Sequence, residues 1–89
     1  MEIDYDLTKD EVNQAKHGVS LAEARLLEWD ELLAKPDRRS SYGETRYIGY
    51  APLGTRLYCV VFTDRASTRR IISLRKANSR EVHRYVRQQ

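Results

Sequence analysis

The sequence predicts a single small domain of the α+β class over residues 1–89, with the element order β-α-α-β-β-β-α. Two patterns indicate this class. In the first half, a short segment in which apolar and acidic residues alternate is followed by capping signals for two successive helices. In the second half, three apolar runs are separated by turn residues. A chain of 89 residues can bury one small core. We therefore expect a twisted antiparallel sheet that packs against helices.

The chain is expected to begin with a half-buried strand and a helix. Ile3 and Tyr5 alternate with acidic residues near the start, which is typical of a strand with one buried face. Thr8 is followed three positions later by Glu11, and this spacing predicts a capped helix start. Gly18 can adopt the left-handed conformation that ends a helix, so the first helix is expected to stop there.

A second helix is predicted immediately afterwards. Ser20 and Glu23 repeat the capping pattern. Pro36 and Asp37 are expected to end this region, and residues 37–43 to form an exposed loop. The predicted apolar face of the helix consists of Ala22, Leu26, Trp29 and Leu33.

The second half is predicted to form a three-stranded meander followed by a helix. Continuous apolar character in the middle run is expected of a central strand that is covered on both faces. Asn78, with Glu81 three positions later, predicts the start of the final helix. The predicted strands are residues 45–50, 57–62 and 70–75, and the turns between them are residues 52–54 and 64–68.

Simple hairpins at these turns would divide the strand residues between two faces of the sheet. A register change of one residue would exchange the faces. The face expected to lie under the first two helices carries Ile48, Tyr50, Leu57, Cys59, Val61, Ile72 and Leu74. The opposite face is expected to carry Tyr47, Gly49, Tyr58, Val60, Phe62, Ser73 and Arg75, with Arg56 and Arg69 nearby.

Charge is distributed unevenly along the chain. Residues 1–37 contain ten acidic and four basic groups, a net charge of −6, whereas residues 38–89 contain twelve basic and three acidic groups, a net charge of +9. All but one of the basic groups in the second part are arginines, whose planar guanidinium binds phosphate through two hydrogen bonds. This asymmetry favours a polyanionic partner such as nucleic acid, with a merely solvated charged surface as the alternative.

The composition also indicates where the protein works. No apolar run is long enough to span a membrane, and the acidic start lacks an apolar signal segment. The single Cys59 lies within an apolar run and cannot form an internal disulfide. We therefore expect a cytoplasmic protein without a membrane partner.

The face that carries Tyr47 and Tyr58 is a candidate RNA platform, because tyrosines can stack on unpaired bases while arginines hold phosphates. The alternative is that these rings pack under the final helix. Arg75 ends an apolar strand, where a charge is costly unless it is paired or exposed in a cleft.

Histidine and lysine near the end of the first helix also have two interpretations. His17 can interact favourably with the helix dipole, or its imidazole can act as a general acid or base. Lys16 can contact phosphate or serve as an ordinary helix-end charge.

Several catalytic classes lack support in the sequence. No His, Cys, Asp or Glu pair has the spacing of a metal site, so no metal or other cofactor is expected. No glycine-rich phosphate loop or serine nucleophile motif is present. Cleavage of RNA would then be metal-independent, with the 2′-hydroxyl as nucleophile and arginines stabilising the transition state. Its general base would be His17, Glu44, a tyrosine or a lysine.

Several segments together resemble the BrnT family of toxins. The likeness begins in the run KHGVS at residues 16–20, followed by Glu23 and Ala24. It continues in GETRYIG at residues 43–49, in TDR at residues 63–65 and in RIISLRKA at residues 70–77, and it ends with Glu81 and Tyr85. The chain departs from the usual pattern in residues 3–6 and at Leu21, but it keeps apolar character in both places.

The resemblance implies an mRNA interferase-like endoribonuclease toxin of a bacterial type II toxin–antitoxin pair, with a fold similar to RelE-like toxins. It also implies a BrnA-like ribbon-helix-helix antitoxin that dimerises, forms a heterotetramer with the toxin and alone contacts operator DNA. Residues carried over from the motifs are Lys16, His17, Glu44, Arg46, Arg65, Arg70, Ser73, Arg75 and Tyr85.

Two functions remain open from the sequence. In the first, the protein is a toxin that cleaves RNA and inhibits translation. In the second, it is a non-catalytic, arginine-rich module that binds nucleic acid or an acidic protein. For the toxin, the catalytic candidates are His17, Arg46, Arg65 and Arg75, and the RNA-binding candidates are Lys16, Tyr47, Tyr58, Arg70, Ser73 and Tyr85.

Overall fold

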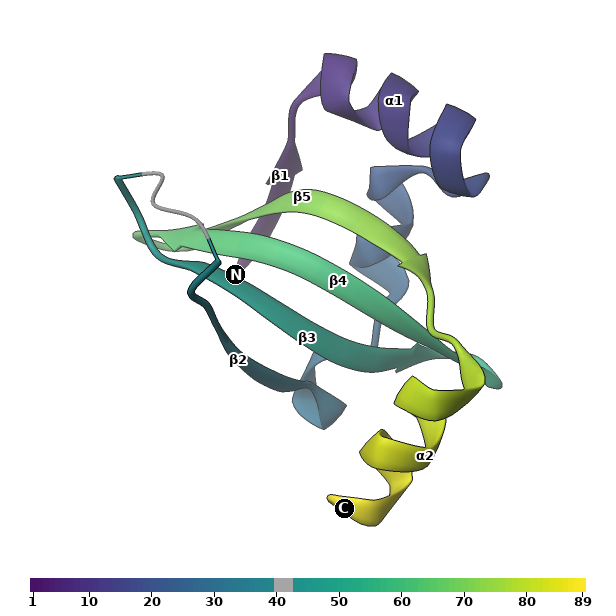
Figure 1. Cartoon of the computed structure of the whole chain (residues 1–89). Coiled ribbons are helices and arrows are strands. Elements are labelled where there is room, and N and C mark those ends of the chain that lie inside the picture. The colour runs from purple at the N-terminus through teal and green to yellow at the C-terminus, as the bar shows by residue number, and fades with distance from the viewer. Residues whose placement is uncertain (40–42) are drawn as a thin grey trace.

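A computed structural model describes residues 1–39 and 43–89 and contains one mixed sheet of five strands (Figure 1). The expected loop at residues 37–43 lies partly outside the described residues. In chain order the elements are β1 (Glu2–Tyr5), α1 (Leu7–His17), the 3₁₀ helices η1 (Leu21–Leu26) and η2 (Trp29–Glu31), β2 (Leu33–Asp37), β3 (Arg46–Leu53), β4 (Arg56–Arg65), β5 (Thr68–Lys76) and α2 (Ser79–Arg87).

The sheet has the strand order β1-β5-β4-β3-β2. The predicted antiparallel meander is confirmed for β3, β4 and β5. The expectation of a wholly antiparallel sheet is wrong, because β1 pairs with β5 in parallel. Parallel neighbours need a long connection, and here the helical layer and three other strands separate β1 from β5 in the chain.

The predicted second helix is wrong in type and length. The capping box of Ser20 and Glu23 is present, but it opens the short 3₁₀ helix η1. Leu21, Ala24 and Leu27 are buried at intervals of three, which matches the three-residue turn of a 3₁₀ helix. Leu26, expected on the buried face, is exposed.

The strand β2 was not predicted, and glycine allows it to lie close to β3. A Cβ atom on Gly49 would lie 2.8 Å from Cδ1 of Leu32 and 2.9 Å from Cβ of Ala34. Pro36 fits this strand because β2 is at the edge of the sheet, where a missing backbone N–H is tolerated.

The observed caps agree with the predictions at the end of α1 and at the starts of η1 and α2, and they differ at the start of α1. Gly18 ends α1 with φ 71°, and Asn78 with Glu81 forms the capping box of α2. However, α1 begins one residue before Thr8, and Asp6 caps it by accepting a hydrogen bond from the backbone N–H of Lys9 (3.0 Å).

A β-bulge changes which residues of β5 share a face with β4. The two-residue turn at Ala66 and Ser67 sets the expected register near the hairpin, but the bulge between Val61 and Phe62 then shifts it by one residue. Arg75 therefore lies opposite Cys59 rather than beside Tyr58. The predicted faces of β3 and β4 are retained, because their register differs from the expected one by two residues.

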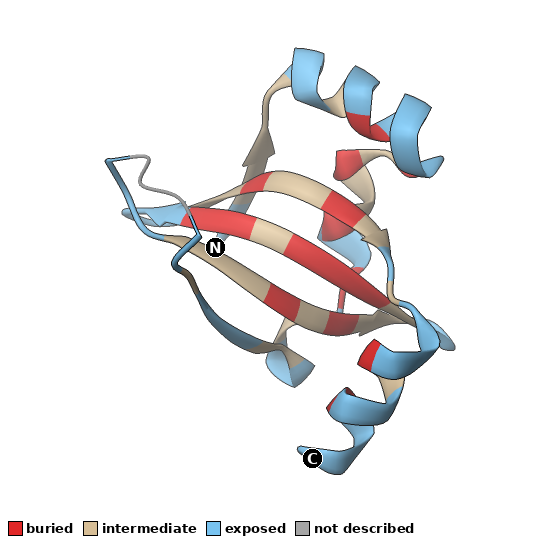
Figure 2. Ribbon diagram, in the orientation of Figure 1, coloured by how far each residue is buried: buried red, intermediate tan, exposed pale blue. Residues whose placement is uncertain are grey.

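The helical layer covers the face that was expected to be open. Figure 2 shows buried residues concentrated in the central strand β4. Asn13 of α1 ties this layer to the sheet, because its side-chain Nδ2 donates to the carbonyl oxygens of Val19 and Leu74 (2.8 Å each). The buried core is Val19, Leu21, Ala24, Leu27, Ala51, Tyr58, Val60, Phe62, Ile71 and Leu74.

Candidate functional site

The sheet face opposite this core gathers most of the predicted arginines, and we call it the open face. It carries Arg46, Ile48 and Tyr50 from β3, Cys59, Val61, Thr63 and Arg65 from β4, and Arg70, Ser73 and Arg75 from β5. The helix α2 lies against this face at the end where β5 stops (Figure 1).

Three arginines surround Glu44 at one end of the open face, and we call this group the arginine cluster (Arg46, Arg65 and Arg70). Nη2 of Arg65 donates to Oε1 of Glu44 (2.8 Å), and Nε donates to Oε2 (3.1 Å). This hydrogen bond lowers the pKa of Glu44, and the charges of Arg46 and Arg70 act in the same direction. The cluster therefore holds an ionised carboxylate among cations that can attract phosphate.

Carboxylates border the arginine cluster on the two outer strands. Asp37 of β2 lies opposite Arg46, and Arg39 holds the pKa of Asp37 at about 2 through a bidentate ion pair. Asp4 of β1 lies opposite Arg70, with 3.5 Å between Oδ2 and Nη2. These two pairs place an acidic side chain of each outer strand beside an arginine of the cluster.

Arg75 is part of a second group, at the opposite end of the open face. Nη1 and Nη2 donate to the two carboxylate oxygens of Glu81, each at 2.9 Å. The hydroxyl of Tyr50 donates to Oε2 of Glu81 (3.0 Å), and the backbone N–H of Asn78 donates to Oε1 (2.9 Å). Glu81 thus accepts bonds from β3, from β5 and from the start of its own helix.

The ion pair and burial change the acidity of this second group. The bonds from Arg75 lower the pKa of Glu81 to about 2 and raise that of Arg75 further. Burial, with Cys59 and Glu81 nearby, raises the pKa of Tyr50 to about 12. All three side chains therefore keep their ordinary charge states at neutral pH, and Tyr50 is an unsuitable general base.

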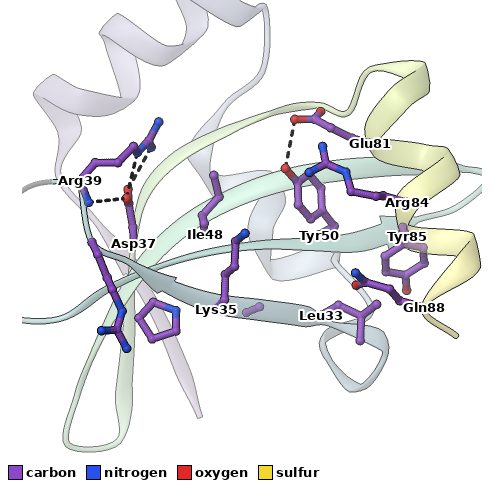
Figure 3. Close-up of a pocket in the computed structure, with 13 residues that line it drawn as sticks. Leu33, Lys35, Asp37, Arg39, Ile48, Tyr50, Glu81, Arg84, Tyr85 and Gln88 are labelled. Atoms are coloured by element: carbon purple, nitrogen blue, oxygen red, sulfur yellow. Dashed lines mark hydrogen bonds and ion pairs between the residues drawn. The ribbon is translucent and has the colours of Figure 1, made fainter.

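A groove of about 990 Å³ lies between β2, β3 and α2 (Figure 3). Ile48 and Tyr50 lie on its sheet side, and Arg84 and Tyr85 reach it from α2. The residues that line it are Leu33, Ala34, Lys35, Pro36, Asp37, Arg38, Arg39, Ile48, Tyr50, Glu81, Arg84, Tyr85 and Gln88.

A family model described as "Ribonuclease toxin, BrnT, of type II toxin-antitoxin system" matches residues 5–81. The chain belongs to the BrnT family. It is therefore a ribonuclease toxin of a type II toxin–antitoxin system, a class with RNA as substrate and an antitoxin as partner. No individual curated protein matches the sequence significantly.

Two further findings concern the described part of this BrnT chain. Residues 1–39 and 43–89 contain no helix that is long and apolar enough to cross a membrane. The same residues contain no group of three or more His, Cys, Asp or Glu side chains placed to hold a metal ion.

The tyrosines proposed as a base-stacking platform face the core of this BrnT chain. Tyr58 is buried, and Tyr47 stacks on Phe62 with 5.5 Å between ring centroids. Their face lies under the first helical layer, so neither the open platform nor packing under the final helix is correct. Tyr85 is also buried, and its hydroxyl donates to the carbonyl oxygen of Glu31 (2.6 Å).

The remaining predicted residues divide between the two sides of the sheet. Lys16 and His17 are exposed in the last turn of α1, which belongs to the layer over the core. Ser73 is half-buried on the open face opposite Val61. The structure therefore brings Arg46, Arg65 and Arg70 together and places Arg75 at the other end of the same face. It leaves His17 in a different layer from all four.

Sequence reasoning missed the roles of Tyr50 and Glu81. Tyr50 was expected under the helices, and Glu81 was seen as a cap with no partner beyond its own helix. The acidic cap residue in an otherwise basic segment was the available signal, since a lone carboxylate among arginines is expected to pair with one of them.

Proposed function

We propose that this BrnT protein is a metal-independent, mRNA interferase-like endoribonuclease that cleaves single-stranded RNA on its open face. The observation that carries the proposal is the arginine cluster around Glu44. A strand of RNA needs an exposed, positively charged surface, and this end of the sheet lies outside the first helical layer.

The proposed reaction uses the RNA's own 2′-hydroxyl. The hydroxyl loses its proton to a general base as its oxygen bonds to the adjacent phosphorus, the bond from phosphorus to the 5′-oxygen breaks, and water supplies the proton that the 5′-oxygen gains. Arg46, Arg65 and Arg70 would stabilise the extra negative charge on the phosphate in the transition state. Arginine itself cannot be the base that accepts the proton of the 2′-hydroxyl, because its pKa lies above 12.

Glu44 is the proton acceptor that the geometry favours over His17. Its carboxylate lies within the arginine cluster, whereas His17 belongs to the layer on the other side of the sheet. The lowered pKa keeps Glu44 ionised at neutral pH, although it also makes the carboxylate a weaker base. His17 is then a helix-end residue that interacts with the dipole of α1.

Cleavage of a labelled single-stranded RNA by purified protein in EDTA tests this proposal. We expect cleavage to persist in EDTA and to fall by about 10²- to 10³-fold in Arg65→Ala. Glu44→Gln should also lose activity, and His17→Gln should retain it. Arg56→Ala, at an exposed position beside the β3–β4 turn, is the matched control for loss of one positive charge.

Two results would contradict the proposal. Activity that EDTA abolishes and Mg²⁺ restores would show a metal-dependent reaction. Binding of RNA without cleavage, under conditions in which the protein is folded, would support the non-catalytic binding module. That alternative is favoured by one observation, namely that Arg65, Arg70 and Arg75 are each already paired with a carboxylate.

We also infer the wider biology from the family. The fold would be similar to that of RelE-like toxins, and the antitoxin would be a BrnA-like ribbon-helix-helix dimer that binds operator DNA and forms a heterotetramer with the toxin in the cytoplasm. Expression of the chain without its antitoxin should arrest growth and inhibit translation. Normal growth at a good level of folded protein would contradict this.

A further inference from the structure

The groove between β2 and α2 continues the basic surface of the open face. Asp37 lines the end of the groove and lies opposite Arg46 of the arginine cluster. Tyr50 lies four positions further along β3 than Arg46, a distance of roughly 13 Å. A strand of RNA held at the arginine cluster could therefore extend along the groove.

Positive charge is present on both sides of this groove. Lys35 and Arg38 belong to the side formed by β2 and the residue that follows it, and Arg84 belongs to α2. Within residues 1–39 and 43–89, none of these three cations is paired with a carboxylate. The carboxylates of Asp37 and Glu81 are neutralised by Arg39 and Arg75. The unneutralised charge in the groove is thus positive.

The sheet side of the groove offers apolar and aromatic surface between these cations. Leu33, Ile48 and the ring of Tyr50 are half-buried there, and Figure 3 shows Leu33 and Tyr50 between Lys35 and the side chains of α2. Positive charge beside aromatic and apolar surface is the combination that binds single-stranded nucleic acid, since phosphates meet cations and bases meet the rings.

Pro36 makes β2 less suitable for binding a protein segment as an added strand. An added strand would pair with the outer edge of β2, but Pro36 lacks a backbone N–H and Lys35 places a charge there. The edge is therefore poorly suited to binding a protein segment by extension of the sheet.

We propose that this groove is a nucleotide-binding subsite for the part of the RNA strand next to the cleavage site. Arg84 and Lys35 bind its phosphates, and a base packs against Tyr50 and Ile48. The inference rests on the proposed function for its substrate class. It adds a second contact region that holds the RNA without taking part in the reaction.

Binding of a non-cleavable RNA analogue tests the subsite independently of catalysis. The probe is a fluorescein-labelled, single-stranded hexanucleotide of mixed sequence with 2′-fluoro groups, which lacks the nucleophilic hydroxyl. Its Kd is measured at several salt concentrations for the wild-type protein, Arg84→Gln, Lys35→Gln and Arg87→Gln. Arg87 is the matched control, because it is an exposed arginine of the same helix that does not line the groove.

Arg84→Gln and Lys35→Gln should each weaken binding several-fold and lower the slope of log Kd against log salt by about 0.7. Arg87→Gln should change neither quantity. In cleavage of longer RNA the two groove variants should raise KM and leave kcat nearly unchanged.

Equal effects of Arg84→Gln and Arg87→Gln would overturn the proposal, as would a wild-type protein that does not bind the probe. Unchanged RNA binding with weaker antitoxin binding would instead assign the groove to the antitoxin. Because the analogue is never cleaved, an absence of ribonuclease activity would contradict the proposed function without altering this result.

Discussion

At the scale of the residue, Glu81 connects three parts of the molecule. It caps α2, accepts both hydrogen bonds of Arg75 from β5 and accepts the hydroxyl of Tyr50 from β3. The side chain of Glu81 is 9% exposed and that of Arg75 is 34% exposed. A largely buried carboxylate with these partners is costly to leave unpaired, so Arg75 has a structural role whatever it contributes to RNA binding.

Replacement of Arg75 should therefore destabilise the fold. We expect Arg75→Ala to lower the free energy of unfolding by about 1–3 kcal/mol, because it removes two charge-assisted hydrogen bonds from Glu81. Urea denaturation followed by circular dichroism measures the change, with Arg80→Ala at an exposed position of α2 as the control. An unchanged urea midpoint would show that Glu81 finds other partners.

The same pair should make stability depend on acid pH. Glu81 has a pKa of about 2 in the folded protein and an ordinary value of 4.5, so its contribution is fully present above pH 4.5 and is lost as the pH falls towards 2. Glu81→Gln should be less stable at neutral pH and should lose less stability across this range. Parallel pH curves for the two proteins, from urea denaturation, would contradict the assignment.

At the scale of the element, the position of β2 depends on close contact with β3. Leu33 and Lys35 pair with Tyr50 and Ile48, which places the edge strand beside the open face and forms one side of the groove. The contact is close at Gly49, where any side chain would meet Leu32 and Ala34. The groove therefore depends on a small residue in β3.

Gly49→Ala should displace β2. The added methyl would lie within 2.9 Å of Cβ of Ala34, and overpacking of this kind costs about 1–3 kcal/mol. We expect a lower melting temperature and weaker binding of single-stranded RNA. The double variant Gly49→Ala with Ala34→Gly should recover part of the stability, and a single variant as stable as the wild type would show that β2 adapts freely.

At the scale of the whole molecule, positive charge is concentrated on the open face, which carries the arginine cluster and the groove. The helices α1 and η1 over the core carry acidic and basic residues in equal number, Asp10, Glu11 and Glu23 against Lys9, Lys16 and Arg25. This arrangement orients a polyanion, or an acidic segment of a partner, towards the open face before contact.

Association with the antitoxin should therefore be sensitive to salt. If an acidic antitoxin segment approaches the open face, its association rate constant should fall as ionic strength rises, while dissociation changes less. Stopped-flow mixing of the purified proteins across a salt series measures both rates. An association rate that does not vary with salt would show that charge does not steer this partner.

Local signals in the sequence predicted several parts of the molecule correctly. Gly18, the capping boxes at Ser20 and Asn78, and the meander β3–β4–β5 all follow from interactions within a few residues or across one tight turn. The BrnT resemblance was equally visible, because its motifs are runs of neighbouring residues, and the family match confirms it.

The order of residues alone was enough to predict the α+β class, the concentration of arginine in the second half and the family. A bulge between Val61 and Phe62 places Arg75 on the side of Cys59 rather than that of Tyr58. The tertiary packing settles which sheet face is open, because Leu21 and Ala24 of η1 pack with Tyr58, Val60 and Phe62. It also decided that β1 joins β5 and that β2 forms the groove, since both depend on contacts between distant segments. Side chains alternate between faces along a strand, so a shift of one residue that leaves every local pattern intact exchanges core and surface.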